Sequence, residues 1–253
     1  MEDVIFQAKT RDGYSIKVLV DLLQCNIKIG NFRISKSGIK LRMIDTQKKI
    51  LIHFTLDSNN FESYKYYMDK EICVGINVLH LHKMLKSIKK KDSIQLFMKD
   101  KSCLGVRVTP RDTNRVTTSY INTQVIQNLD VRLPSDYDNN VHVSAGEYQK
   151  MCKDMNMIGQ VIRIQSNEDF VKFSCSDNNV YKREVTFGSA EDTDVVTYDE
   201  LYDTDQLYRI IKISGMTQQL HIYTKKSLPL LIKAKIGLLG DIELYIKNKS
   251  QIN

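Results

Sequence analysis

Histidine, cysteine and acidic side chains are the groups in this sequence that could catalyse a reaction or bind a metal. The cysteines, at positions 25, 73, 103, 152 and 175, are too far apart for a zinc-ligand motif, and they indicate reduced thiols used as small core residues. His80 and His82 are two positions apart, a spacing that turns them to different sides of a helix. There is no glycine-rich phosphate loop and no HExxH motif. The sequence therefore predicts no catalytic residue, no metal site and no cofactor, and it favours a binding protein over an enzyme.

Basic residues carry the stronger signal. The chain has 37 Lys and Arg against 30 Asp and Glu, a formal net charge of +7, which favours an acidic polymer such as nucleic acid as a partner. Many of these bases recur three or four positions apart, a spacing that places them on one face of a helix. The bases that this spacing turns away from the apolar stripes are Lys17, Lys83, Lys86, Lys90, Lys150, Lys153, Arg209 and Lys212, and such a surface suits contacts to phosphate groups.

Four amphipathic segments position these bases. Apolar spacing predicts helices over 14–23, 78–88, 146–156 and 205–213. Asn77 is expected to cap the second helix, Ser144 and Glu147 form an S-x-x-E capping box for the third, and Gly215 ends the fourth. Basic residues on a helix are usually just solvated, but here four helices share the pattern.

Acidic residues are scarce on these helices and concentrate in 135–138 and 188–205, the second of which reads as an acidic surface loop. The exposed helix faces carry Asp21, Asp154 and Asp205. No aromatic residues alternate with the bases, so the backbone of duplex DNA is favoured over a stacked single strand.

An internal repeat organises the chain. Residues 81–96, LHKMLKSIKKKDSIQL, match residues 207–222, LYRIIKISGMTQQLHI, at a constant offset of 126, since 209 − 83 = 126. The repeat predicts two similar domains, 1–116 and 141–253, joined by a connector at 117–140 that contains Pro134. Strands are expected at 3–9, 32–37, 39–44, 49–56, 71–75, 93–98, 103–109, 116–121, 141–144, 161–166, 169–175, 180–187, 218–224, 229–234 and 241–246. The fold class is α+β, with two helices per domain packed on antiparallel β-sheets.

The sequence shows no segment that would place the protein in a membrane. It has no run of 18 apolar residues, and its first residues, MEDVIFQAK, lack the features of a signal peptide. An intracellular protein is expected.

Several stretches together resemble the proliferating cell nuclear antigen family, the eukaryotic-type DNA sliding clamps. They are SGIKLRMID (37–45), FTLDSNNFESYK (54–65), GINVLHLHKMLKSIKKKDSIQL (75–96), NLDVRLP (128–134), SAGEYQKMCKDMNMIG (144–159), VKFSCS (171–176) and LPLLIKAKIGLLGDIELYI (228–246). Each is weak alone, but their joint order along nearly the whole chain is specific.

The resemblance implies the DNA clamp fold, in which three chains close head to tail into a ring whose helices surround duplex DNA. It implies that the DNA backbone is faced by Lys17, Lys83, Lys86, Lys150, Lys153 and Lys212, with Lys89, Lys90, Lys91 and Arg209 as weaker candidates. It also implies that the clamp tethers a DNA polymerase and other replication or repair proteins. It also implies an ATP-dependent clamp loader, and localisation in the nucleus or, for a viral protein, at the site of viral DNA replication. Edge strands near 103–121 and at 180–187 would join the subunits of a homotrimer.

The resemblance further implies a groove that binds a short partner motif with apolar and aromatic anchors. The matching positions are Ile44, Leu51, Val131, Leu133, Pro134, Pro229 and Tyr245.

The sequence departs from the family at the basic net charge, at Lys48 and Lys49 beside the groove, and at the C-terminal YIKNKSQIN. The Lys-, Asn- and Ile-rich composition is typical of an AT-rich genome, such as that of a large DNA virus. Two alternatives stay open: a monomeric or dimeric polymerase accessory factor that binds DNA through a basic face without encircling it, and one subunit of a heterotrimer.

Overall fold

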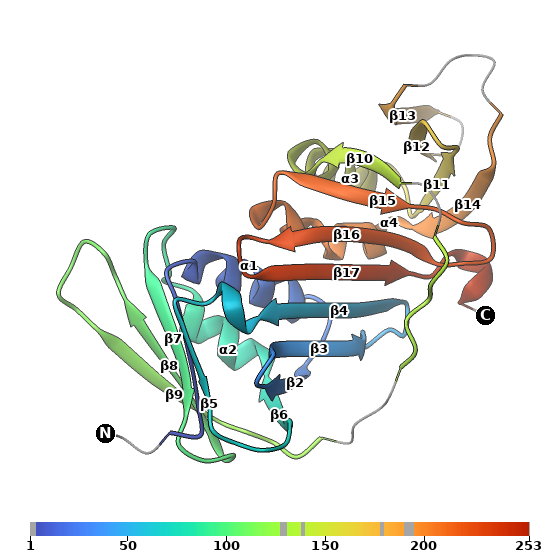
Figure 1. The fold of residues 1–253 in the computed structure, drawn as a ribbon. Coiled ribbons are helices and arrows are strands. Elements are labelled where there is room, and N and C mark those ends of the chain that lie inside the picture. Colours follow the sequence, from blue (N-terminus) through green and yellow to red (C-terminus); the bar gives the residue numbers. More distant parts are fainter. Residues whose placement is uncertain (1–3, 127–130, 138–139, 178–179, 190–194, 253) are drawn as a thin grey trace. The chain divides into compact units, whose positions relative to one another are not determined.

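A computed structural model describes residues 4–126, 131–137, 140–177, 180–189 and 195–252. The chain forms two compact units (Figure 1). Unit 1 consists of Met1–Met43, His53–Val131 and Lys235–Ile242, and unit 2 of Ile44–Ile52, Arg132–Ala234 and Glu243–Asn253. Residues 127–130 and 138–139 of the expected connector, and 190–194 of the expected acidic loop, lie outside the described residues.

Unit 1 contains two α-helices, α1 (Gly13–Gln24) and α2 (Val78–Leu85), and a 3-10 helix, η1 (Ser58–Asn60). Five antiparallel strands form one sheet in the order β5-β1-β7-β8-β9. Strands β6, β2, β3 and β4 follow one another in a second sheet, and β3 and β4 are joined through the segment 44–52. The strand bounds are β1 (Phe6–Thr10), β2 (Ile29–Ser35), β3 (Gly38–Ile44), β4 (Ile50–Asp57), β5 (Ser63–Tyr66), β6 (Ile72–Asn77), β7 (Ser93–Met98), β8 (Cys103–Thr109) and β9 (Thr117–Asn122).

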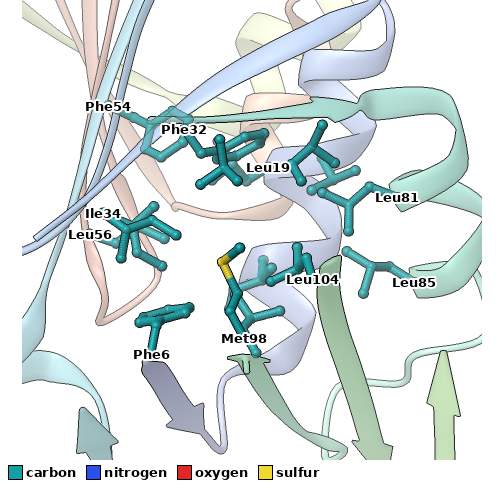
Figure 2. A pocket seen from close by; sticks show the side chains of 16 residues that line it. Phe6, Leu19, Phe32, Ile34, Phe54, Leu56, Leu81, Leu85, Met98 and Leu104 are labelled. Atoms are coloured by element: carbon teal, nitrogen blue, oxygen red, sulfur yellow. The ribbon is translucent and has the colours of Figure 1, made fainter. Parts of the chain in front are cut away.

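The core of unit 1 lies between the two helices and the two sheets. Figure 2 shows side chains from α1, α2 and the surrounding strands, among them Leu19, Leu81 and Phe54, which line an apolar cavity of about 50 Å³. Val18 and Leu22 of α1 are also buried, beyond the single apolar stripe that the spacing predicts. The helix is therefore held by packing on more than one side, which limits the surface that it offers to a ligand.

Two glycines in unit 1 are required by close approach. Gly38, the first residue of β3, has φ +137°, and a Cβ there would lie 2.0 Å from the Leu56 carbonyl oxygen. Gly105 in β8 lies opposite Phe97 in β7, and a Cβ at this position would lie 2.3 Å from the Phe97 ring. The space above Gly105 is thus filled by the ring of its cross-strand neighbour.

Unit 2 contains α3 (Ala145–Ile158), α4 (Thr204–Arg209) and two 3-10 helices, η2 (Ile211–Gly215) and η3 (Lys249–Gln251). One antiparallel sheet has the order β13-β12-β11-β14, and β10, β15, β16 and β17 follow one another in the other. The strand bounds are β10 (Asn140–Ser144), β11 (Val161–Ser166), β12 (Phe170–Asp177), β13 (Tyr181–Gly188), β14 (Tyr198–Asp203), β15 (Gln219–Tyr223), β16 (Leu230–Ile236) and β17 (Gly240–Ile246).

The two halves of the chain repeat one topology. The order β1-β7-β8-β9 recurs as β10-β15-β16-β17, and β6-β2-β3-β4 recurs as β14-β11-β12-β13. Helix α2 begins at Val78 and α4 at Thr204, so 204 − 78 = 126, the offset of the sequence repeat. The predicted α+β class with antiparallel sheets is confirmed.

Three local predictions are wrong. Ser144 makes no side-chain capping bond to α3; instead a capping box joins Asp203 and Gln206 at the start of α4. The fourth helix is not continuous over 205–213, because α4 ends at Arg209 and the chain turns through Ile210 into η2. Residues 198–203, expected in an acidic loop, form strand β14.

Candidate nucleic-acid and partner interfaces

Helix α1 contributes one basic side chain, and it is only half exposed. Lys17 Nζ donates a hydrogen bond to the carbonyl oxygen of Ile88, 3.3 Å away, just beyond the end of α2. The same ammonium lies 5.6 Å from the centre of the Tyr14 ring. The two helices of unit 1 also meet through His82 Nδ1 and Asp21 Oδ1, which are 2.8 Å apart. Lys17 therefore joins α1 to the turn after α2 as well as facing solvent.

Helix α2 is short but well defined, and it presents lysines to solvent. The Asn77 side chain accepts a hydrogen bond from the His80 amide, which confirms the predicted cap. Val78, Leu81 and Leu85 are buried, whereas Lys83 and Lys86 are exposed. Burial of one stripe thus turns these two lysines outward, as their spacing predicts.

The turn after α2 is held by Asp92, a buried residue. Its Oδ2 accepts a hydrogen bond from the Lys89 amide at 2.9 Å, and its own amide donates to the Lys89 carbonyl at 3.1 Å. The turn exposes Lys89, Lys90 and Lys91. Lys90 Nζ lies 5.9 Å from the centre of the Tyr14 ring.

Tyr14 is thus an aromatic residue set among bases, contrary to the expectation that none is interleaved with them. Tyr14 and Lys90 are separated by most of a domain in the sequence, so no local pattern pairs them. They meet only because α1 lies beside the turn after α2. Rings and ammonium groups at such distances attract each other.

In unit 2, α3 and η2 present three exposed lysines. Lys150 and Lys153 lie on α3, whose Tyr148, Met151 and Met155 are buried. Lys212 lies in η2, which packs against α3. Gln149 Nε2 of α3 donates a hydrogen bond to the Ile211 carbonyl oxygen of η2, 3.4 Å away. We refer to the five exposed lysines that lie on or directly cap these helical segments as the helix lysines. They are Lys83, Lys86, Lys150, Lys153 and Lys212.

The acids of the α-helices are mostly engaged by other bases. Asp21 pairs with His82, Asp154 Oδ2 lies 2.8 Å from Arg183 Nη1, and Asp205 Oδ2 lies 3.1 Å from Arg209 Nε. Glu147, exposed in the first turn of α3, is the exception. Among the residues that the structure describes, none of the helix lysines forms an ion pair, so their charge is available to a ligand.

Arg209 does not face outward, and that part of the prediction is wrong. Its side chain is only 11% exposed, and its Nη1 lies 2.8 Å from Oδ2 of Asp45, whose side chain is fully buried. The spacing of three from Lys212 suggested a shared face, but the two residues lie on different helical segments.

Two of the groove positions in unit 2, Pro229 and Tyr245, contact Tyr137, a residue that sequence reasoning missed. Tyr137 donates a hydrogen bond from its hydroxyl to the Pro229 carbonyl at 2.7 Å, and its ring centre lies 6.3 Å from that of Tyr245. Burial, together with the nearby Tyr198 and Glu243, raises the pKa of the Tyr137 hydroxyl. The hydroxyl therefore stays protonated and a donor at neutral pH. The run PSDYDNN hides this residue, because it reads as a polar linker.

The other groove positions differ in exposure. Ile44 is 42% exposed, an unusual state for isoleucine, whereas Leu51, Leu133, Pro134 and Pro229 are half-buried. Tyr245 is 4% exposed, and its hydroxyl donates to Glu243 Oε2 at 2.7 Å. Val131 belongs to unit 1, where its carbonyl accepts a hydrogen bond from Arg42 Nη1 at 3.1 Å.

The expected subunit edges correspond to terminal strands of two sheets. Strand β9 is the last strand of the five-stranded sheet, and it exposes Tyr120, whose ring packs edge-on against Phe97 at 6.0 Å. Strand β13 is the last strand of the four-stranded sheet. Its first residue, Tyr181, and the preceding Val180 are exposed. Exposed apolar edge strands are a risk for aggregation unless another strand covers them.

Other classes of site find no support in the described part of the chain. No group of three or more His, Cys, Asp or Glu residues there is arranged to hold a metal ion. None of the described helices has the length and apolar character that a membrane-spanning helix needs.

Comparison with known proteins covers nearly the whole chain. Residues 5–132 match the family model of the proliferating cell nuclear antigen N-terminal domain, and residues 133–249 match that of its C-terminal domain. The chain is 27% identical over 256 residues to a probable DNA polymerase sliding clamp 1 of Paramecium bursaria Chlorella virus 1, covering 97% of both chains. It is 22% identical over 263 residues to the proliferating cell nuclear antigen of Dictyostelium discoideum, covering 97% of this chain and 99% of the relative. The chain belongs to the proliferating cell nuclear antigen family of DNA sliding clamps, which are processivity factors and not enzymes.

Proposed function

We propose that three copies of this chain close into a ring around duplex DNA and that the helix lysines face the phosphate backbone. The observation that carries the proposal is the pattern of charge on the helices: five exposed lysines in two units lack ion-pair partners among the described residues, while most helix acids are engaged by other bases. Lys17, Lys89, Lys90 and Lys91 extend this surface at the end of α2.

The proposed contacts suit a protein that slides. Lysine binds phosphate through charge rather than by reading bases, so the contacts do not depend on DNA sequence and weaken with salt. A closed ring keeps the DNA by topology even when each contact is weak. A polymerase tethered to the ring then meets the primer end at a high effective concentration, which raises processivity.

We assign ring closure to the edges of β9 and β13. Two unlike edges that pair head to tail generate a closed ring when the rotation between subunits permits it. Pairing would also cover Tyr120 and Tyr181, which are 65% and 52% exposed. The proposed domains are 1–116 and 141–253, with the connector at 117–140.

We assign partner binding to Ile44, Leu51, Leu133, Pro134, Pro229 and Tyr245, with Val131 of the connector. An exposed isoleucine, several half-buried apolar groups and a buried tyrosine suit a short motif with apolar and aromatic anchors. DNA polymerase is the principal partner in this proposal, and an ATP-dependent loader would open the ring. The protein would act where DNA is replicated, in the nucleus or at a viral replication site.

Two measurements test the ring. Light scattering should give a mass near three times 29.3 kDa. The loaded protein should escape from linear DNA and stay on the same DNA with blocked ends, because only a ring slides off a free end. A monomer or dimer that binds both DNAs equally would refute encirclement and favour direct binding through a basic face. A chain that forms a ring only with a related chain would indicate a heterotrimer.

A further inference from the structure

The turn between β3 and β4, residues 45–50, is organised by one buried carboxylate, and we call it the Asp45 loop. Asp45 Oδ1 accepts hydrogen bonds from the amides of Lys49 at 2.7 Å and Ile50 at 2.8 Å, and Oδ2 accepts one from Gln47 at 3.3 Å. Lys48 has φ 61°, an uncommon backbone conformation for a long side chain. The shape of the loop therefore depends on where the Asp45 carboxylate is held.

Arg209, from the end of α4, holds this carboxylate. Its Nη1 lies 2.8 Å from Asp45 Oδ2, although the two residues are 164 positions apart in the sequence. Its Nε lies 3.1 Å from Asp205 Oδ2, on the preceding turn of the same helix. A planar guanidinium can serve two carboxylates at once, which a lysine ammonium does less well.

A second set of bonds fastens the Asp45 loop and the C-terminal segment, residues 246–252, to the start of α4. Asp203, the N-cap of α4, lies 2.7 Å from Lys49 Nζ through Oδ2 and 3.1 Å from Lys249 Nζ through Oδ1. The Lys247 amide donates to the Lys49 carbonyl at 3.0 Å, and Gln206 Nε2 donates to the Lys247 carbonyl at 3.1 Å. Helix α4 thus anchors both segments.

These segments adjoin the proposed partner site. The Asp45 loop is flanked in the chain by Ile44 and Leu51, and the C-terminal segment directly follows Tyr245. Ile44 directly precedes the Asp45 loop, and its side chain is exposed rather than held by core packing. The backbone conformation of the loop therefore sets the direction of this side chain. If Arg209 turned toward DNA, it would leave the Asp45 carboxylate buried without its cation, which is strongly unfavourable.

We propose that Arg209 is a positioning residue of the partner site and not a DNA-contact residue: through Asp45 it fixes the loop that joins Ile44 to Leu51. This inference rests on the proposed partner role of those two residues. It separates the functions of Arg209 and Lys212, which the sequence places together.

The test compares Arg209→Met, Arg209→Lys and Asp45→Asn in the full chain with Lys212→Met as the matched control. One assay measures the dissociation constant of a fluorescent peptide that carries the apolar and aromatic anchors. A second measures how binding to a short DNA duplex depends on salt. A third follows hydrogen exchange of the Gln47, Lys49 and Ile50 amides.

Arg209→Met and Asp45→Asn should each weaken peptide binding at least about tenfold. A variant that combines Arg209→Met with Asp45→Asn should bind the peptide only slightly more weakly than either single variant, because both substitutions remove the same bond. Arg209→Lys, which keeps a charge beside Asp45, should recover part of the affinity. Lys212→Met should leave peptide binding unchanged and reduce the salt dependence of DNA binding. The inference is overturned if Arg209→Met keeps peptide affinity within about twofold while reducing the salt dependence of DNA binding.

Hydrogen exchange distinguishes failure of this inference from failure of the proposed function. If the unaltered chain binds no peptide, the proposed partner site is wrong and this inference falls with it. If peptide binding is present, Arg209→Met should speed exchange of the three loop amides while the rest of unit 2 keeps its protection. Unchanged exchange in the loop would show that Arg209 does not position it.

Discussion

Exchanging Lys86 and Lys212 for glutamine should change how DNA binding responds to salt. Both residues are exposed and lack ion-pair partners among the described residues, so their replacement removes charge without breaking a contact inside the protein. Each phosphate contact contributes about 0.9 to the slope of the logarithm of the binding constant against the logarithm of salt concentration. Loss of two contacts in one subunit should lower that slope by about 1.8, and loss in all three subunits of a ring sets an upper limit of about 5.4.

The measurement is fluorescence anisotropy of a short duplex, titrated at several salt concentrations. A matched variant, Lys36→Gln with Lys226→Gln, removes the same charge from exposed turns, one in each unit. Only the first variant should lower the slope substantially. Equal effects of the two variants would show that net charge, rather than the position of the lysines, governs DNA binding, and the assignment of the helix lysines would be refuted.

Three further predictions concern the fold. Leu85→Ala should lower the free energy of unfolding by about 2–5 kcal/mol in a denaturant titration, because Leu85 is fully buried beside a cavity; a loss below about 1 kcal/mol would mean that the core closes around the gap. Cys73, which is exposed, should react with a thiol reagent in the folded protein, whereas Cys152 should react only after unfolding, since burial raises its thiol pKa to about 12; equal rates would contradict this. Burial would raise the pKa of the Asp203 carboxyl, but hydrogen bonds from Lys49 and Lys249 lower this pKa overall. The ionised carboxylate therefore stabilises the folded protein fully above the ordinary carboxyl pKa, and this stabilisation is lost as the pH falls through the lowered pKa of the folded state. The stability difference between the unaltered protein and Asp203→Asn should therefore shrink in acid, and a constant difference would refute the linkage.

Most elements could be predicted from the sequence because their signals are local. The alternation in residues 103–109 needs only neighbours to be read, and the cap of α2 at Asn77 lies beside the helix that it begins. Strand β14 was missed because its sequence, YDELYD, is acidic and does not alternate. Its strand conformation depends on β11, where Arg163 Nε lies 2.6 Å from Asp199 Oδ1. That partner is distant in the sequence, so no local pattern reveals it.

Residues of the candidate site could be predicted where helical spacing alone determines that a side chain is exposed. They could not be predicted where the side chain is bound by a partner that is distant in the sequence. Lys83 and Lys153 are exposed because buried residues occupy the opposite face of each helix. Arg209 has the same spacing relation to Lys212, but the helix breaks between them and a buried carboxylate 164 positions away captures the guanidinium. Tyr137 was missed for a similar reason, since its partners Pro229 and Tyr245 lie about a hundred residues downstream.

In the proposed clamp, the type of base separates two uses of positive charge. All five helix lysines are point charges on flexible stems, which can exchange one phosphate for the next without a fixed geometry. A guanidinium that gripped phosphate with two parallel hydrogen bonds would hold the DNA more firmly and oppose sliding. The arginine of the same region instead spans Asp45 and Asp205, where a fixed geometry is useful. The proposed clamp would move along DNA and yet present a well-ordered partner site, which needs both kinds of contact, and the division between lysine and arginine would supply them.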